Sequence, residues 1–546
     1  MDEKPDPETH PPEAQNSVES EKGADGNLMA VGVGASAGGL EAFTELLTHL
    51  PPATGMAFIL VQHLDPHHQS ALPEILSAKT RMPVVQVQND TPIKSDHVYV
   101  IAPNTVMLIR NRTLTLEARP VTPEKFRPID SFFDSLAEEF RFNAVGIVLS
   151  GTASDGTLGL KKIKAEGGIT FAQNQTAKFD SMPRSAIAAG VVDFILTPRR
   201  IAEELVAISR QTLHLSRAES AMTGDDTTRH RLLLLLRSNT GVDFTQYKQP
   251  MVLRRLNRRM LVRKSESLEQ YFELLQRDSQ EAKALFDDLL IKVTDFFRDP
   301  DVFESAKRVA FPSIVRHRKL PDTIRVWIPG CSSGEEVYSM AIALVEFLES
   351  EDLDSKIQMF GTDVSDTAID RARASVYDES SVANISPERL RRFFLRTESG
   401  YQVSRTIREM CIFSRHNVAK DPPLSRMDLI SCRNLLIYLS PSLQRRIIST
   451  FGYALQPTGC LMLGPSETLG SLSEYFLTLD ERHKIYCRKA DVSQGVFSSS
   501  EARWDDAPQQ TTPLAAPPRV EAPNPVVSKN SIALKHRFSP GARNHH

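Results

Sequence analysis

The sequence predicts an α/β protein with two doubly wound, mostly parallel sheets, one in each of two domains. From residue 28 onward, short apolar runs such as LMAVGVG, MAFILVQ and AVGIVLS alternate with amphipathic segments. Strands that alternate with helices indicate βαβ units and a parallel sheet. The same alternation starts again at TIRVWIPGCSSGEE, and a chain of 546 residues is too long for one hydrophobic core.

Shifts in composition give the predicted domain boundaries. Both ends are rich in polar residues and proline, and they bury too little apolar surface to fold. A polar stretch around MTGDDTT separates the domains, and the leucine-rich stretch after it has helical spacing. The prediction is a disordered tail (1–27), a first α/β domain (28–210), a linker (211–229), a helical subdomain (230–300), a second α/β domain (301–490) and a disordered Pro/Ser-rich tail (491–546).

Composition excludes several classes of protein. A formal net charge of -3 argues against a dedicated nucleic-acid binder. The five cysteines are odd in number and form no CxxC pair, so we expect neither a disulfide framework nor a metal site, and we expect a reducing cytoplasm. No apolar leader and no stretch of about 18 apolar residues is present, which argues against export and membrane insertion.

Three polar residues follow predicted strands of the first domain. They are Ser36 in GASAGG, His63 after MAFILVQ, and Asp155 in TASDG. The carboxyl ends of parallel strands form the crevice where ligands bind. A serine becomes nucleophilic when an imidazole takes its proton, and a carboxylate orients that imidazole. The sequence therefore predicts a Ser/His/Asp hydrolase site, with glycines that leave backbone amides facing an oxyanion.

Simpler interpretations of these residues stay open. Ser36 is also compatible with a helix cap, His63 with a surface histidine, and Asp155 with the turn of an Asp-Gly pair. The pattern G-x-G-x-x-A after the first strand also fits a dinucleotide site, and hence an oxidoreductase. Its acidic partner is then Asp65, which lies beyond the usual spacing of about 20 residues.

The second domain carries a pattern for adenosyl binding. Gly330 and Gly334 form a turn after a strand, Glu335 follows them, and Asp363 ends the next strand. A glycine turn lets the backbone approach a cofactor, and an acidic residue at the second strand binds ribose hydroxyls. An ordinary strand-to-helix turn with acidic residues in its first helical turn explains the same pattern.

The segments GASAGGLEA, LVQHLDPHHQSAL and LSGTASDGTLGLKKIKAEGG closely resemble the catalytic domain of chemotaxis protein-glutamate methylesterases (CheB type), over about residues 28–210. The resemblance implies that Ser36 is the nucleophile, His63 the general base and Asp155 the orienting acid. The chain departs from the family at Ala37, where threonine is usual, and in TASD, which lacks a typical methionine. With only a short polar stretch before the first strand, we expect no receiver domain and no control by aspartyl phosphorylation in cis.

The segments TDFFRD, GCSSGEEVYSMAIAL, GTDVSDTAIDRAR and DLISCRNLLIYL strongly resemble chemotaxis receptor glutamate methyltransferases (CheR type) over about residues 230–490. The resemblance implies a Rossmann-like methyltransferase with an N-terminal helical subdomain and a small β-subdomain near YQVSRTIREMCIF. Lys292 stands where relatives commonly have asparagine. The resemblance also implies S-adenosylmethionine as co-substrate, contacted by Thr294, Arg298, Glu335, Asp363, Asn417, Val418, Asn434 and Leu435.

The helical segment LRRLNRRMLVR carries arginines at three- and four-residue spacing, so much of one face is expected to be cationic. By the resemblance this face meets the acidic, methyl-accepting helix of a receptor. A solvated or internally paired surface would explain the same spacing. The expected substrate-facing residues are Arg254, Arg255, Arg258 and Arg259.

Together these observations predict a bifunctional chemotaxis-type enzyme. The first domain is expected to hydrolyse protein glutamate methyl esters and release methanol, and the second to methylate receptor glutamates. The expected partners are methyl-accepting chemoreceptor-like proteins, so any membrane contact is indirect, and no nucleic acid is expected. The competing hypothesis is a signalling scaffold in which one or both domains are inactive.

Overall fold

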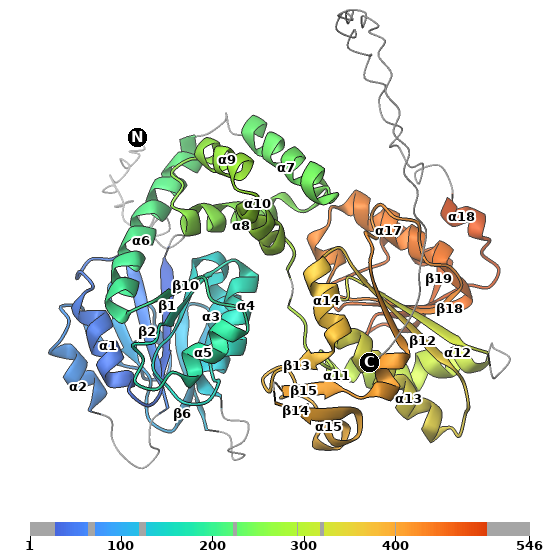
Figure 1. Cartoon of the computed structure of the whole chain (residues 1–546), viewed down its shortest axis with the longest axis horizontal. Helices are drawn as coiled ribbons and strands as arrows, with labels where there is room; N and C mark the ends of the chain where they lie inside the picture. Colours follow the sequence, from blue (N-terminus) through green and yellow to red (C-terminus); the bar gives the residue numbers. More distant parts are fainter. Residues whose placement is uncertain are drawn as a thin grey trace, which may run out of the picture. The chain divides into compact units, whose positions relative to one another are not determined.

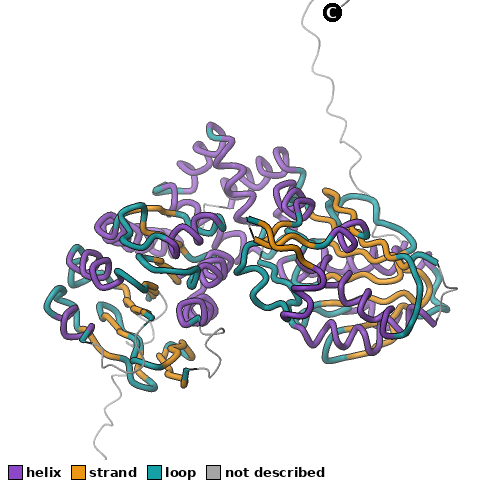
Figure 2. The backbone as a smooth tube through the Cα atoms, turned by 60° about the horizontal axis from the view of Figure 1, so that its bottom comes forward, coloured by secondary structure: helices purple, strands orange, loops and turns teal. Residues whose placement is uncertain are grey.

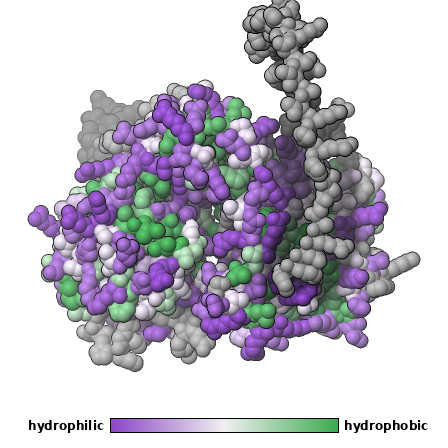
Figure 3. Space-filling model, in the orientation of Figure 1, coloured by the Kyte–Doolittle hydropathy of each residue, from purple (hydrophilic) through white to green (hydrophobic). Residues whose placement is uncertain are grey.

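The computed structural model describes residues 28–63, 71–119, 127–221, 226–291, 293–316, 322–398 and 400–498. Two seven-stranded sheets organise this part of the chain, as predicted (Figure 1). In Figure 2 the strands of each sheet lie between helices. Polar residues cover most of the face visible in Figure 3, and the apolar patches between them are limited. None of the helices within the described ranges has the length and apolar character to cross a membrane.

The first sheet has the order β10-β9-β8-β1-β2-β5-β3, and all of its strand pairs are parallel. Every residue of β1 and β8 is buried, which explains why these strands are continuous apolar runs without alternation. The strands are β1 (Met29–Ala35), β2 (Met56–Gln62), β3 (Val84–Gln86), β5 (Val98–Val100), β8 (Ala144–Val148), β9 (Ile169–Gln173) and β10 (Phe194–Leu196).

Helices cover both faces of this sheet. One core contains apolar residues of α1 (Gly39–Thr48), α2 (Leu72–Ser77) and α6 (Pro198–Ala221), and the other contains those of α3 (Pro128–Phe140), α4 (Thr157–Glu166) and α5 (Ser181–Ala188). This is the doubly wound arrangement that was predicted. A small antiparallel sheet of β4 (Thr91–Pro92), β6 (Thr105–Arg110) and β7 (Thr113–Ala118) lies beside α3.

A helical subdomain follows, with a core of its own. It contains α7 (Asp226–Thr240), α8 (Gln249–Arg263), α9 (Leu268–Arg277) and α10 (Ser279–Leu289). Side chains of Ser267 and Asp278 cap α9 and α10 by accepting backbone N–H groups. Most of the segment predicted as a linker is helical, because α6 continues to Ala221 and α7 begins at Asp226; residues 222–225 lie outside the described residues.

The second sheet has the order β16-β12-β11-β17-β18-β20-β19. The first five strands are parallel, and β20 and β19 add an antiparallel hairpin. Its faces are covered by α13 and α14 on one side and α17 on the other. The elements are α11 (Pro300–Ser305), α12 (Phe311–Arg316), β11 (Ile324–Pro329), α13 (Glu335–Ser350), β12 (Ile357–Asp363), α14 (Asp366–Ala374), β16 (Cys411–Arg415), β17 (Met427–Cys432), α17 (Pro441–Ala454), β18 (Leu455–Leu463), β19 (Phe476–Asp480) and β20 (Ile485–Arg488).

The stretch YQVSRTIREMCIF does not all belong to the small β-subdomain. Its first residues form β15 (Gly400–Val403), which pairs with β13 (Val376–Tyr377) and β14 (Phe394–Thr397). The chain then forms α16 (Arg405–Glu409), and its last residues begin β16 at the edge of the main sheet. Alternation of apolar residues predicts a strand, but it does not say which sheet the strand joins.

The C-terminal prediction is wrong over its first residues. A short helix, α18 (Gln494–Ser498), packs on α17. Phe497 is buried there, and its carbonyl accepts a hydrogen bond from Ser449 Oγ (3.0 Å). Gly452 provides the space, since a Cβ at that position would lie 2.3 Å from the Phe497 ring. The predicted disorder of residues 1–27 and 499–546 falls outside the described residues.

A buried acid joins α3 to α4. Asp130 is 8% exposed, and its Oδ1 accepts the N–H of Gly159 at 2.8 Å. Arg127 approaches its other oxygen only to 3.6 Å. Burial and then the negative charge of Asp155 raise the pKa of Asp130 to about 7. The first domain therefore holds a carboxyl group whose charge changes near neutral pH.

This raised pKa makes stability depend on pH. The pKa of this acid is about 4 in the unfolded chain and higher in the folded one. Its contribution to the free energy of unfolding is therefore complete below pH 4 and is lost as the pH rises from there through 7. Asp130→Asn removes the charge and should increase the free energy of unfolding at pH 8 more than at pH 5, by on the order of 2 kcal/mol. Urea denaturation at both pH values measures this difference.

The matched control is Asp134→Asn on the same helix, because the Asp134 side chain is 54% exposed. We expect its effect to be small and equal at the two pH values. An Asp130→Asn effect that does not change between pH 5 and pH 8 would show that the Asp130 carboxyl is not held protonated.

Candidate functional site

The ends of three neighbouring strands bring Ser36, His63 and Asp155 together. His63 Nδ1 lies 3.3 Å from Ser36 Oγ, and His63 Nε2 lies 2.9 Å from Asp155 Oδ2. The Asp155 side chain is 6% exposed, whereas that of His63 is 30% exposed. The acid is therefore buried behind a partly exposed histidine, as an orienting acid requires.

Backbone amides hold the Asp155 carboxylate in place. Its Oδ2 accepts the N–H of Ile129 (3.0 Å), and its Oδ1 accepts those of Asp130 (2.9 Å) and Gly156 (3.0 Å). The first two amides belong to the first turn of α3, whose positive end stabilises an anion. The side chain is therefore fixed from behind, with Oδ2 directed at the histidine ring.

The loop after β1 presents the serine. The Ser36 N–H donates to the carbonyl of Ser150 (3.0 Å), and the Ser36 carbonyl accepts the N–H of Gly39 (2.9 Å). Gly38 has φ 75°, and a Cβ there would lie 2.6 Å from Ser150 Oγ, so the turn requires glycine. Gly38, not Ser36, is the N-cap of α1, and no side chain caps this helix. Ser36 therefore does not serve as the helix cap.

Asp155 also forms the turn that is typical of an Asp-Gly pair. Its carboxylate accepts the N–H of Gly156, but the same carboxylate binds His63, so the turn does not exclude contact with the histidine ring. Ala153, in the run that departs from the family, has φ 67°. Asp65, the acid that a dinucleotide site would require, lies outside the described residues.

A second pocket lies at the ends of β11 and β12. Five of the eight predicted cofactor contacts line it: Asp363, Asn417, Val418, Asn434 and Leu435. The helical subdomain supplies part of its wall, which the sequence did not predict. These additional lining residues are Tyr247, Leu289, Leu290 and Ile291. Both polar and apolar side chains therefore line the pocket, as in many small-molecule sites.

The Asp363 carboxylate is oriented by two amides. Its Oδ2 accepts the N–H of Ser332 (2.9 Å), and its Oδ1 accepts that of Ser365 (2.9 Å). Gly330, in the turn after β11, has φ 68°, and a Cβ there would lie 3.0 Å from Leu435. The glycine therefore lets Leu435 pack closely against this turn, and the Asp363 carboxylate lines the same pocket. This arrangement fits an adenosyl group, whose ribose hydroxyls need an acceptor and whose base needs apolar walls.

Three predicted contacts do not line this pocket: Thr294, Arg298 and Glu335. The Thr294 carbonyl accepts a hydrogen bond from Lys161 (3.0 Å), and Arg298 donates to the carbonyl of Val293 (3.0 Å). Glu335 is 3% exposed and accepts from Ser333 Oγ, and burial raises its pKa. Lys292 lies outside the described residues.

Two buried charges that were not predicted from the sequence support this pocket. Glu467 accepts the N–H groups of Gly464, Asn434 and Leu436 (2.6 to 3.1 Å), so it fixes the turn that carries Asn434 and Leu435. The Arg433 side chain is fully buried and donates to Asp299 (2.7 Å) and to the Arg298 carbonyl (2.9 Å). Arg433 directly precedes the predicted pocket residue Asn434. A charged residue in such a position is the signal that could have identified it.

The predicted cationic face of α8 is not exposed, and this corrects the expectation for the substrate-facing arginines. Arg255 and Arg258 are 4% and 1% exposed. Arg255 donates to the carbonyls of Lys164 and Ala165, and Arg258 pairs with Asp193 and Asp288. Burial opposes ionisation of Asp193, but Arg258 and Lys164 outweigh it and lower the pKa of Asp193 to about 2.

The two remaining arginines of this face, Arg254 and Arg259, differ in their exposure and in their partners. Arg259 pairs with Glu281, which is 2% exposed and also accepts from Tyr271 Oη (2.7 Å). Arg254 is partly exposed and donates to the carbonyl of Pro250 (3.0 Å). The cationic face was predicted from the spacing of the arginines along α8, whereas the groups that pair with them lie on segments distant in the sequence. Internal pairing therefore describes three of the four residues.

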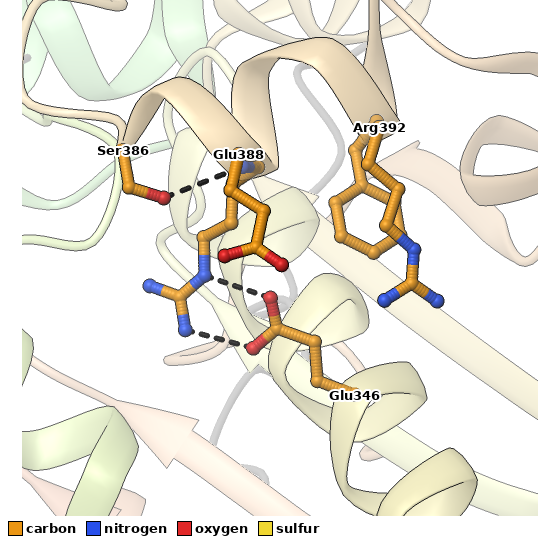
Figure 4. Close-up of a pocket in the computed structure, with 6 residues that line it drawn as sticks. Glu346, Ser386, Glu388 and Arg392 are labelled. Carbon is orange, nitrogen blue, oxygen red and sulfur yellow. Dashed lines mark hydrogen bonds and ion pairs between the residues drawn. The ribbon is translucent and has the colours of Figure 1, made fainter.

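A third pocket is polar and lies between α13 and α15 (Pro387–Phe393). Figure 4 shows its side chains, with Glu346 on α13 below Ser386 and Glu388 at the start of α15. Arg389 makes a two-pronged ion pair with Glu346 (2.8 and 2.7 Å). Lys307 also pairs with Glu346 (2.6 Å), and the Arg389 guanidinium lies over the Phe297 ring. These contacts pair the charges with one another, so this pocket attaches the small β-subdomain to α13.

Comparison with known proteins gives the family. Residues 31–205 match the CheB methylesterase family, residues 229–290 the all-alpha domain of CheR methyltransferase, and residues 292–485 its SAM binding domain. The chain is 34% identical to a chemotaxis protein methyltransferase 2 of Vibrio cholerae over 43% of this chain and 84% of that protein. It is 33% identical to a putative protein-glutamate methylesterase/protein-glutamine glutaminase of Leptospira interrogans over 34% of this chain and 98% of that protein.

An uncharacterized 104.1 kDa protein of Rhodobacter capsulatus matches across both regions. It is 36% identical over 439 residues, which are 76% of this chain and 46% of that protein. The chain thus spans less than half of this relative. The matches divide along the same boundary as the two sheets, with the serine-histidine-aspartate cluster in one part and the pocket at Asp363 in the other. The chain belongs to the CheB methylesterase and CheR methyltransferase families, with a domain of each.

Proposed function

We propose that this chain both removes and installs methyl esters on glutamate side chains of chemoreceptor-like proteins. The observation that carries the proposal is the hydrogen-bonded series from Ser36 Oγ through the His63 ring to the buried Asp155. That series has the chemistry of ester hydrolysis. The second activity rests on the pocket at Asp363 and on the SAM binding domain.

The proposed hydrolysis uses the geometry of this series. Ser36 Oγ attacks the ester carbonyl carbon while its proton passes to His63 Nδ1, the ring nitrogen that faces it. Asp155 accepts the Nε2–H and stabilises the imidazolium, and amides at the start of α1 stabilise the oxyanion. The intermediate collapses as Nδ1 returns the proton to methoxide, which leaves as methanol. Water, deprotonated by the same nitrogen, then cleaves the glutamyl-Ser36 ester and restores serine and glutamate.

Methyl transfer needs different help from the protein. Bound S-adenosylmethionine supplies a methyl group already activated by its sulfonium. Asp363 would hold the ribose hydroxyls, and Leu435 and Val418 would pack against the base. Glu467 and Arg433 keep the turns of the pocket in place. The acceptor glutamate is already anionic at neutral pH, so these residues act by positioning and by exclusion of water, and no general base is required.

The acceptor is proposed to be the methylated region of a chemoreceptor-like protein, because a methylesterase and a methyltransferase joined in one chain share a substrate. The chain is proposed to act in the cytoplasm, where such regions lie.

Replacing the nucleophile tests the first activity. Ser36→Ala should reduce methanol release from a protein that carries glutamyl methyl esters by about four orders of magnitude or more, because no other group in the series can form the acyl-enzyme. Gas chromatography of methanol measures the rate. The control Ser77→Ala, an exposed serine that bonds only locally to the Pro73 carbonyl, should release methanol at the parent rate. Equal rates for Ser36→Ala and the parent chain would remove the serine mechanism.

Replacing the ribose acceptor tests the second activity. Asp363→Asn should weaken binding of S-adenosylmethionine about ten- to hundredfold, because a charged acceptor becomes a neutral one that also carries donors. Calorimetric titration measures the dissociation constant. Asp366→Asn, at the start of α14 with a side chain 69% exposed, should bind like the parent chain. A parent chain that binds no S-adenosylmethionine would favour the signalling scaffold.

A further inference from the structure

The loop of residues 174–180, which connects β9 to α5 near Ser36, is held by several side-chain hydrogen bonds. Gln173 is buried, its Oε1 accepts the Ser150 N–H (2.9 Å), and its Nε2 donates to Thr176 Oγ1 (3.4 Å). Asn174 Oδ1 accepts both the N–H and the hydroxyl of Thr176 (3.1 and 2.7 Å). These bonds attach the loop to the sheet edge that carries the serine.

Phe179 is fixed at both of its backbone groups. Its N–H donates to Ser150 Oγ (3.0 Å), and its carbonyl accepts the N–H of Gly151 (2.9 Å). Gly151 in turn packs on the nucleophile, because a Cβ on it would lie 3.0 Å from Ser36 Cβ. A Cβ on Gly38 would lie 3.4 Å from the Phe179 ring. The ring therefore adjoins the loop that presents Ser36.

The Phe179 side chain is nevertheless 40% exposed. Single exposed apolar side chains are common on protein surfaces and need no function. Two features distinguish this one. Its N–H and carbonyl are both hydrogen-bonded, so less backbone entropy is lost when a partner covers the ring, and the ring lies beside Gly38, two residues from the nucleophile. Phe142 of the same domain is 46% exposed, but it packs near Gly167 at the end of α4.

We propose that Phe179 determines substrate specificity in the esterase domain by packing against an apolar side chain that flanks the methylated glutamate. The inference rests on the proposed hydrolysis of glutamyl methyl esters. A segment whose ester carbonyl reaches Ser36 passes over Gly38 and its neighbouring ring. In a helical segment, residues four apart lie on one face, so an apolar residue one turn from the ester covers Phe179. Phe179 thus acts on binding of the segment and takes no part in the bond changes at Ser36.

The test compares two probes in the full chain. One is a helical alanine-rich peptide with one glutamate γ-methyl ester and a leucine four residues away, and the other is N-acetylglutamate γ-methyl ester, which lacks neighbouring residues. Phe179→Ala should raise KM for the peptide about three- to tenfold and leave kcat within twofold, because the uncovered part of one aromatic ring is lost from binding. It should leave kcat/KM for the small ester unchanged, and Phe179→Leu should restore most of the peptide affinity.

Phe142→Ala is the matched control, since it removes an exposed phenylalanine of the same domain away from Ser36, and it should behave like the parent chain with both probes. Equal loss on the peptide and the small ester would show that Phe179 only shapes the serine loop, and no loss on either would show that the ring meets no substrate. Both results overturn the inference. A parent chain that hydrolyses neither probe would instead contradict the proposed hydrolysis.

Discussion

Strand register is the constraint on which the esterase site depends. In the parallel pair of β1 and β2, Ala35 lies opposite Gln62, so Ser36 and His63 are the next residues on adjacent strands. On the opposite side of β1, Gly34 lies beside Val148, and the chain after β8 returns Asp155 to the same edge. A shift of one residue in either pair would turn these side chains to opposite faces. Both faces of these strands are buried, so the shift would also place valines of β1 where Gly32 and Gly34 now leave room for α3. A Cβ on Gly34 would already lie 2.4 Å from Ile129.

The esterase site also requires a fixed carboxylate, and α3 provides it at a cost in the stability of the domain. The first amides of this helix hold Asp155, and the same helix places the Asp130 carboxyl beside it. Burial raises the pKa of the Asp130 carboxyl, and the negative charge of Asp155 raises it further. A functional site that reduces the stability of its own domain is a common result of holding a charge in a chosen position.

Much of the fold, and the residues of the first site, could be predicted from the sequence. Apolar runs identified the strands, and parallel pairing implied that Ser36, His63 and Asp155 end at one edge. The positions that could not be predicted depend on contacts across long separations. Helical spacing placed the arginines of α8 on one face, but Asp193, Asp288 and Glu281, which pair with them, come from different elements. Part of the apolar lining of the pocket at Asp363 likewise comes from Leu289, Leu290 and Ile291, which follow no recognisable binding pattern.

The contact between Phe497 and Gly452 has a consequence for how this chain can vary. Even an alanine at position 452 would displace the aromatic ring, and α18 would then detach from α17 and from Tyr475 and Phe476, which lie against that ring. A chain shortened to end before Gln494 would leave the same surface of α17 open to water. The two positions are therefore expected to change together among relatives, and the folded methyltransferase domain reaches Phe497, beyond the point where the composition of the tail turns polar.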